Sequence, residues 1–168
     1  MFEAKKRFGL CVLNYTLTSN HIHVLVYDHQ EDVIPRSMQL IAGRTGREYN
    51  TRKNRKGAFW EDRYHATAIK TDAHFSKCLV YIDLNMVRAG VVRHPSEWEF
   101  GGYAEIQAPK QRYAIIDRGA LRNLLGLEED AQLTALHKRW VEDVLVNETH
   151  KRDAKWTESI AVGDKGFV

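Results

Sequence analysis

Two short runs of β-forming residues, separated by a turn sequence, constrain the fold of this chain more than any other feature. Residues 10–17 (LCVLNYTL) and 21–27 (HIHVLVY) are rich in β-branched, aromatic and other apolar side chains. Residues 18–20 (TSN) between them are typical of a turn. We therefore expect an antiparallel hairpin over residues 10–27.

Helical and extended segments alternate after the hairpin. Residues 33 to about 50 have a loosely amphipathic helical pattern, and residues 63–69 (RYHATAI) favour another strand. The pair Thr71-Asp72 can cap a long helix that Gly90 terminates. This order predicts an α+β fold in which helices pack on an antiparallel sheet.

The second part of the chain is predicted to be mainly helical. An aromatic cluster surrounds the pair Gly101-Gly102, and its members are Trp98, Phe100 and Tyr103. After about residue 115, apolar residues recur at helical spacing; they are Leu133, Leu136, Trp140, Val144 and Leu145.

Composition limits the class of protein. The chain has 168 residues, of which 43% are apolar, so we expect one domain's worth of chain with a packed core. Its two cysteines, Cys11 and Cys78, lack CxxC spacing, which argues against a disulfide framework and a cysteine-rich zinc site. No apolar run reaches the roughly 18 residues of a membrane span, and residues 1–30 lack a signal-peptide pattern. We expect a soluble intracellular protein without a membrane partner.

Positive charge is concentrated in one stretch of the chain. The formal net charge is +3, whereas residues 36–70 contain nine basic and three acidic residues and so carry +6. Such a local excess is typical of surfaces that bind nucleic-acid phosphates. A solvated helix face followed by a basic loop explains the same charges equally well.

Two histidines occupy alternate positions of the second predicted strand. His21 and His23 share one face, with Cα atoms about 6.6 Å apart, and can converge on one metal ion. The apolar residues between and after them are expected to point into the core on the opposite face. The pattern alone is weak, because chance gives about 0.4 HxH pairs in a chain with this many histidines. The other histidines are predicted to be surface or structural residues: His29, His65, His74, His94, His137 and His150.

The helix expected over residues 72–89 has an unusual polar face. Tyr81, Asn85 and Arg88 are spaced i, i+4 and i+7 and share that face, whereas Asp83 lies about 200° around the helix from Tyr81. A phenol has a free pKa of about 10, so it attacks phosphorus only with help from a cation or metal. An Asn85 oxygen could complete a metal site with the two histidines. A half-buried tyrosine whose hydroxyl bonds to a neighbour also explains the pattern.

Three ordered segments resemble a known family. They are residues 20–26 (NHIHVLV), 59–64 (FWEDRY) and 81–90 (YIDLNMVRAG). Similar segments occur in this order in the REP-associated tyrosine transposases, which are IS200-like, one-tyrosine HUH endonucleases that act on single-stranded DNA. The resemblance covers roughly residues 10–105.

The resemblance implies a site and a mechanism. His21, His23 and Asn85 would bind a divalent metal, Mg²⁺ or Mn²⁺. Tyr81 would cut single-stranded or hairpin DNA through a 5′-phosphotyrosine intermediate, and a 3′-hydroxyl would rejoin it, during DNA transposition and recombination. Trp60 or Tyr64 would stack on exposed bases, and a place in the core explains Trp60 equally well. The residues expected to bind DNA are Arg44, Arg47, Arg52, Lys53, Arg55, Lys56, Arg63 and Arg88.

The resemblance also implies a ferredoxin-like HUH endonuclease fold. Residues 1–105 would form the transposase catalytic domain, without the N-terminal strand that precedes the hairpin in the family, and residues 106–168 would form a helical C-terminal extension. The family implies a cytoplasmic, nucleoid-associated protein of bacterial type. The sequence leaves open whether it is a monomer or a homodimer.

Two other functions remain compatible with the sequence. A catalytically inactive remnant would bind hairpin DNA without cutting it. A metal-independent module for RNA or protein would contain the two histidines by coincidence.

Overall fold

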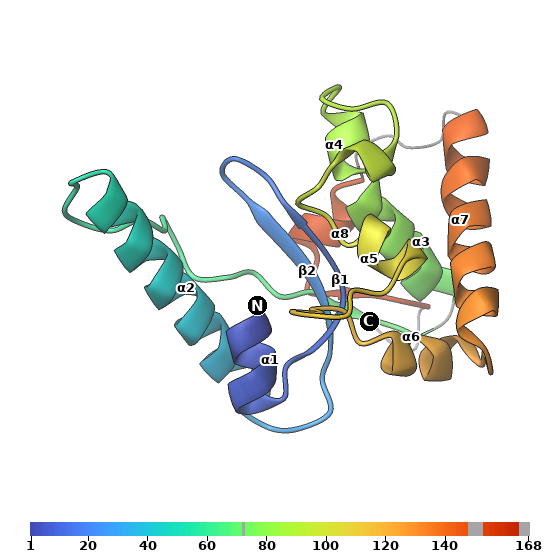
Figure 1. The fold of residues 1–168 in the computed structure, drawn as a ribbon, viewed down its shortest axis with the longest axis horizontal. Helices are drawn as coiled ribbons and strands as arrows, with labels where there is room; N and C mark the ends of the chain where they lie inside the picture. Colours follow the sequence, from blue (N-terminus) through green and yellow to red (C-terminus); the bar gives the residue numbers. More distant parts are fainter. Residues whose placement is uncertain (72, 148–152, 165–168) are drawn as a thin grey trace.

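A computed structural model describes residues 1–71, 73–147 and 153–164 (Figure 1). Asp72, which was predicted to help cap a helix, and His150 lie outside the described residues. Helices and a small antiparallel sheet make up the described part of the chain, which confirms the α+β prediction.

The predicted hairpin is present. Strand β1 (Cys11–Leu17) pairs antiparallel with β2 (Ile22–Tyr27), and Thr16 lies opposite His23. A β-bulge follows Val12. The turn residues and the β-forming runs therefore define this element locally.

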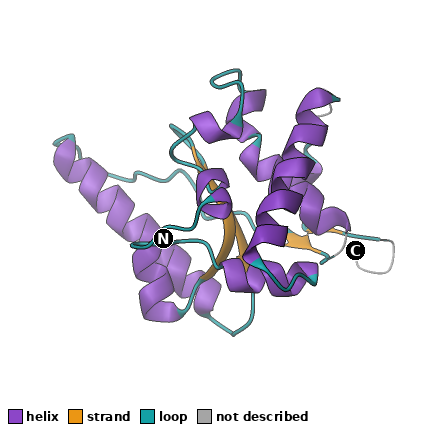
Figure 2. Cartoon of the chain, turned by 45° about the vertical axis from the view of Figure 1, so that its right-hand side comes forward, coloured by secondary structure: helices purple, strands orange, loops and turns teal. Residues whose placement is uncertain are grey.

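Helices lie on both sides of the hairpin (Figures 1 and 2). Helices α1 (Phe2–Phe8) and α2 (Val33–Arg52) lie on one side, and α3 (Ala73–Asp83), α5 (Tyr103–Gln107) and α7 (Asp130–Val146) lie on the other. Helix α2 confirms the amphipathic pattern that starts at residue 33. The end of α2 that leads into the basic loop projects away from the rest of the molecule (Figure 1).

Two loop segments line the outer edge of β1. Isolated bridges join Thr16 to Gly101 and Val12 to Ile116. Gly102 approaches β1 so closely that a Cβ atom there would overlap Asn14 Oδ1 of the strand, and it would also lie 2.8 Å from Ile116 Cδ1. This crowding explains why a glycine is needed at position 102.

The aromatic cluster predicted around these glycines is divided between two places. The rings of Trp98 and Phe100 meet edge to face at 5.4 Å, and the Trp98 indole N–H donates to the Leu17 carbonyl at 3.0 Å. Tyr103 belongs to a second core cluster, where its ring lies 5.3 Å from the His137 ring.

The strand predicted over residues 63–69 is much shorter than expected. Only Ala68–Ile69 form β3, which pairs in parallel with β4 (Ala161–Val162) and not with the hairpin. Residues 63–66 are exposed and lack a partner strand within the described ranges. The prediction was wrong because β-forming side chains make a strand only where a partner strand is available.

The long helix predicted to end at Gly90 is interrupted at Leu84. A short helix α4 (Asn85–Arg88) follows Leu84, whose φ and ψ are −81° and 7°. Helical hydrogen bonds cross the interruption: the Leu84 N–H donates to the Val80 carbonyl at 3.0 Å, and the Arg88 N–H donates to the Leu84 carbonyl at 2.9 Å. Gly90, with φ +69°, ends the helical segment as predicted.

The later helices share the core of the hairpin. Helix α6 (Arg118–Leu125) is capped by Asp117, whose carboxylate accepts the Ala120 N–H at 2.9 Å. Leu121 and Leu133, on α6 and α7, are fully buried in the same cluster as the strands. The division of the chain at residue 105 stays a prediction.

Two further short helical segments are present, η1 (Pro95–Glu97) and α8 (Lys155–Glu158). None of the described helices is long and apolar enough to cross a membrane.

Candidate active site

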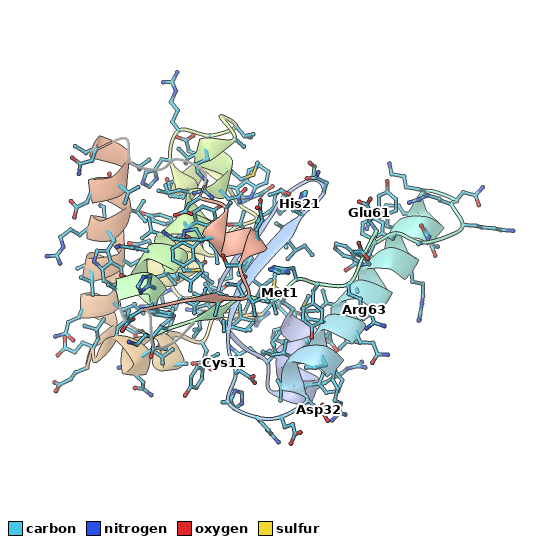
Figure 3. The ribbon with its side chains drawn as sticks, turned by 180° about the vertical axis from the view of Figure 1, so that it is seen from behind. Met1, Cys11, His21, Asp32, Glu61 and Arg63 are labelled. Carbon is cyan, nitrogen blue, oxygen red and sulfur yellow. The ribbon has the colours of Figure 1, made fainter. Side chains whose placement is uncertain are left out.

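The hairpin turn fixes the first histidine. The His21 N–H donates to Thr18 Oγ1 at 2.9 Å, and the Thr18 N–H donates to the His21 carbonyl at 2.9 Å. His21 is exposed at this end of the hairpin (Figure 3), and His23 is half-buried two residues further along. The two imidazole rings are nearly parallel, with an interplanar angle of 9° and 6.3 Å between their centroids.

The histidine-bearing face of β2 points toward α3. Residues paired across two strands project to the same face, and His23 is paired with Thr16. Thr16 Oγ1 in turn donates to the Ile82 carbonyl of α3 at 2.8 Å. Leu25, on the same face as His23, is only 7% exposed. His21 is exposed, as expected for a histidine that points away from the core, whereas His23 is half-buried because helices cover both faces of the hairpin.

Tyr81 lies on α3, and two side chains contact its ring. The guanidinium carbon of Arg88 is 3.8 Å from the ring centroid, and the Trp156 ring centroid is 6.0 Å away. Arg88 Nη2 also donates to the Tyr81 carbonyl at 2.8 Å. Tyr81 and Arg88 therefore share a face, as their spacing predicted, although the helix is interrupted between them.

Arg88 connects Tyr81 electrostatically with the histidines. Burial lowers the pKa of the His23 imidazole, and the nearby charges of His21 and Arg88 lower it further. Burial also lowers the pKa of the Arg88 guanidinium, while its interaction with Tyr81 opposes that change. His23 therefore favours its neutral form, which is the form that binds metal ions.

Asn85 is the first residue of α4 and is half-buried. Its carbonyl accepts the Ala89 N–H at 3.1 Å. Its side-chain amide makes no hydrogen bond with any residue in the described ranges, so the amide oxygen is available to an external ligand. The structure thus packs Arg88 against Tyr81, within range for its charge to act on His23. It places Asn85 on the same helical segment without a hydrogen bond to either histidine of the hairpin.

His21 and His23 are the imidazole donors that the hairpin offers to a divalent metal ion. Within the described part of the chain, no hydrogen bond engages the ring nitrogens of His21 or His23. Two nitrogens on one ion lie at most about 4.2 Å apart, so a shared ion requires both rings to turn their nitrogens toward each other across the 6.3 Å between their centroids. The described residues contain no group of three His, Cys, Asp or Glu side chains that could hold a metal. A third ligand from these residues would therefore be an amide or carbonyl oxygen, such as the side-chain oxygen of Asn85.

Seven of the eight residues predicted to bind DNA are exposed and lie away from Tyr81. They occupy the second half of α2, the loop after it and the segment leading to β3: Arg44, Arg47, Arg52, Lys53, Arg55, Lys56 and Arg63. The eighth, Arg88, is half-buried against Tyr81. Exposed ion pairs engage two of the seven, since Arg44 lies 3.7 Å from Glu3 and Arg52 lies 2.8 Å from Glu48. The structure therefore separates a projecting basic segment from the surroundings of Tyr81 (Figure 1).

The two aromatic candidates for base stacking differ in exposure. The Trp60 indole N–H donates to the Ala42 carbonyl at 3.0 Å, and its ring meets the Phe59 ring edge to face at 4.9 Å. Trp60 is thus packed against α2. Tyr64 is 46% exposed between α2 and β3, which makes it the better candidate.

Several buried polar residues that contact α3 around Tyr81 were not predicted from the sequence. Asn14 and Thr16 alternate on one face of β1, and both donate hydrogen bonds to α3. Asp83 pairs with His137, with 2.7 Å between Oδ2 and Nε2. The burial of His137 agrees with the structural role predicted for it. Two polar residues at alternate positions of an otherwise apolar strand were the available signal.

One comparison with known proteins identifies a family. Residues 1–85, half of the chain, match the family described as Transposase IS200 like. The match includes both histidines of the hairpin, Tyr81 and Asn85. No curated protein and no solved structure matches the chain significantly. On the family match, the chain belongs to the IS200-like transposase family.

Proposed function

We propose that the chain cleaves and rejoins single-stranded DNA, including hairpin DNA, through a covalent bond to Tyr81. The observation that carries the proposal is the position of Arg88. Its guanidinium carbon is 3.8 Å from the Tyr81 ring centroid, and its charge also acts on His23. A potential nucleophile and a cation are therefore in contact, and one of the two candidate metal-binding histidines lies within range of the charge of that cation.

In the proposed step, the Tyr81 hydroxyl oxygen bonds to phosphorus while the bond from phosphorus to the 3′ oxygen breaks. The phenolic proton is released to solvent, and the leaving 3′ oxygen takes up a proton. The products are a 3′-hydroxyl strand and a 5′-phosphotyrosine. A second 3′-hydroxyl reverses the step and joins two strands. No ATP is needed, because the phosphotyrosine bond conserves the energy of the phosphodiester.

Arg88 assists the attack in this proposal. A guanidinium next to the phenol and the phosphate favours the negative charge that develops during the reaction. Arginine pKa values lie above about 12, so Arg88 keeps its charge at neutral pH although burial lowers its pKa.

His21, His23 and Asn85 are the proposed ligands of Mg²⁺ or Mn²⁺. A bound ion supplies positive charge that polarises the scissile phosphate. The lowered pKa of His23 keeps its imidazole neutral and able to act as a ligand.

The projecting basic segment of α2 and the following loop is proposed to contact the DNA backbone. Its exposed arginines and lysines suit phosphate binding, and Tyr64 is placed to stack on an unpaired base. A protein with this activity would be found at the DNA, as expected for a nucleoid-associated protein.

Covalent trapping tests the proposal. Labelled single-stranded hairpin DNA, incubated with the protein and Mn²⁺, should give an adduct that survives denaturation. Tyr81→Phe should abolish the adduct, and omission of divalent metal should prevent it. Tyr113→Phe is the matched control, because Tyr113 is 72% exposed and its ring packs against Phe2.

An adduct that persists in Tyr81→Phe would disprove the role of Tyr81. Binding of hairpin DNA without cleavage under any metal would favour the inactive, DNA-binding remnant. If DNA does not bind and the combined change His21→Ala and His23→Ala leaves metal binding unaltered, the proposed site does not exist.

A further inference from the structure

Side chains of β1 are hydrogen-bonded to α3 on both sides of Tyr81. Asn14 Nδ2 donates to the Leu79 carbonyl at 3.0 Å and to Asp83 Oδ1 at 2.9 Å. Thr16 Oγ1 donates to the Ile82 carbonyl at 2.8 Å. The attached positions on α3 therefore lie two residues before Tyr81 and one and two residues after it.

Asp83 is also hydrogen-bonded to α7, on the other side of α3 from β1. The His137 ring on α7 lies against it, with 2.7 Å between His137 Nε2 and Asp83 Oδ2, and both side chains are fully buried. Gln107 Nε2 lies 2.8 Å from His137 Nδ1 and donates to the Thr134 carbonyl at 3.4 Å. Because the Gln107 amide nitrogen is a donor, His137 Nδ1 accepts and His137 Nε2 donates its proton to Asp83.

We propose that Asn14, Thr16, Asp83 and His137, here called the α3 clamp, position Tyr81 against the histidines of the hairpin. The inference rests on the proposed function. Strand β1 is paired with β2, and Thr16 lies opposite His23. Bonds from β1 to α3 consequently set the position of the nucleophile relative to the histidine-bearing strand.

Hydrogen bonds suit this role better than apolar contacts do. An apolar interface tolerates sliding and rotation of a helix, whereas a hydrogen bond weakens steeply away from its preferred distance and angle. Three hydrogen bonds from two side chains of one strand therefore fix both the register and the rotation of α3. Reactions that depend on orientation are sensitive to such placement, since a shift of about 1 Å can lower a rate by about 100-fold.

The clamp joins parts of the chain that are distant in sequence. Asn14, Thr16 and Asp83 lie within the family match at residues 1–85, whereas His137 lies outside it. The helical region after residue 106 thus contributes a positioning residue through Asp83, although it contributes no candidate nucleophile or metal ligand.

The decisive variant is Thr16→Val, which keeps the shape of the side chain and removes its hydrogen bond to Ile82. Single-turnover formation of the Tyr81 adduct, measured with labelled hairpin DNA and Mn²⁺, should slow by about 10- to 100-fold. The dissociation constant for DNA should stay within about threefold of the wild-type value, because the change affects orientation and not binding. Thr16→Ser restores the hydroxyl and should restore the rate.

Thr134→Val is the matched control. Its hydroxyl donates to the Asp130 carbonyl at 3.0 Å and accepts from Arg118 Nη2 at 3.3 Å, so its loss affects α7 without touching the clamp residues. This variant should react at the wild-type rate. Asp83→Asn is a second variant for the case that Thr16→Val does not fold, and it should also slow the reaction.

Hydrogen exchange gives a readout that does not depend on activity. Thr16→Val should exchange faster than wild type over residues 79–88, and Thr134→Val should not. Unchanged exchange in Thr16→Val would overturn the clamp, even if the wild type forms no adduct and the proposed function fails. A Tyr81-dependent adduct that forms equally fast in wild type and Thr16→Val would overturn the clamp and leave the proposed function intact.

Discussion

Replacing His137 by leucine should strongly destabilise the protein, because it leaves a buried carboxylate poorly paired. Asp83 Oδ2 lies 2.7 Å from His137 Nε2, and both side chains are fully buried. In His137→Leu the carboxylate keeps only the bond from Asn14. Removing a hydrogen-bond partner of a buried charged group costs about 1.5–3 kcal/mol. For a chain of this size, about 2–4 °C of melting temperature is lost per kcal/mol, so Tm should fall by about 3–12 °C.

A double-mutant cycle separates the charge effect from lost packing. Asp83→Leu combined with His137→Leu removes the charge together with its partner, and apolar replacement of a buried pair is often neutral. Asn14 then loses one acceptor, which costs about 1 kcal/mol. The double variant should therefore be more stable than His137→Leu alone in urea unfolding followed by circular dichroism.

His29→Leu is the control for the histidine-to-leucine change, because His29 is exposed. It should alter stability by less than about 0.5 kcal/mol. The reasoning is refuted if His137→Leu costs less than about 1 kcal/mol, or if the double variant is no more stable than the single one.

Three further perturbations test other parts of the structure. Gly102→Ala should lower the unfolding free energy by about 1–3 kcal/mol in thermal melts, because the new Cβ would overlap Asn14 Oδ1; an unchanged Tm would contradict the close approach. Arg88→Met should slow adduct formation by about 100-fold or more, and Arg88→Lys by less, since the lost charge faces Tyr81; equal rates for all three proteins would exclude that role. Burial raises the pKa of the Cys78 thiol to about 12, so a thiol reagent at pH 8 should label Cys78 only after unfolding. The free thiol titrates near 8.5 when unfolded, so this group lowers folding stability as pH rises above that value, and rapid labelling of the native protein would contradict its burial.

Features encoded by neighbouring residues could be predicted from the sequence. The hairpin follows from two β-forming runs joined by Thr18-Ser19-Asn20, and its turn is closed by Thr18 itself. The i, i+7 spacing of Tyr81 and Arg88 was enough to place them together, because helical hydrogen bonds continue across Leu84. Local periodicity is informative when the backbone repeats regularly.

Features that depend on distant partners could not be predicted in this way. Residues 63–66, which were predicted to be extended, lie outside any strand of the described ranges, and β3 pairs with Ala161–Val162. Trp156 reaches the Tyr81 ring from a part of the chain with no pattern that pointed there. The interruption at Leu84 was also missed, because apolar residues recur at helical spacing on both sides of it: Phe75, Leu79, Ile82 and Met86.

Asp83 illustrates how a correct geometric argument can hide a role. Its position about 200° from Tyr81 excluded it from the metal site predicted at His21 and His23. In the structure its carboxylate instead bonds to Asn14 and His137. A residue that fixes α3 to β1 and α7 must, however, lie on the side of the helix that faces away from Tyr81, and Asp83 lies there.

The candidate reactive residues lie in the first half of the chain, whereas the residues that hold them in place are spread over both halves. Both histidines, Tyr81 and Asn85 lie within residues 1–85, and a chain ending at residue 105 would retain them all. Such a chain would lose His137, together with the Leu121 and Leu133 side chains that are fully buried against the hairpin. Asp83 would then keep a single partner from β1. The sequence pattern thus locates the proposed chemistry in the first half of the chain, whereas the packing that would make it work extends through α7.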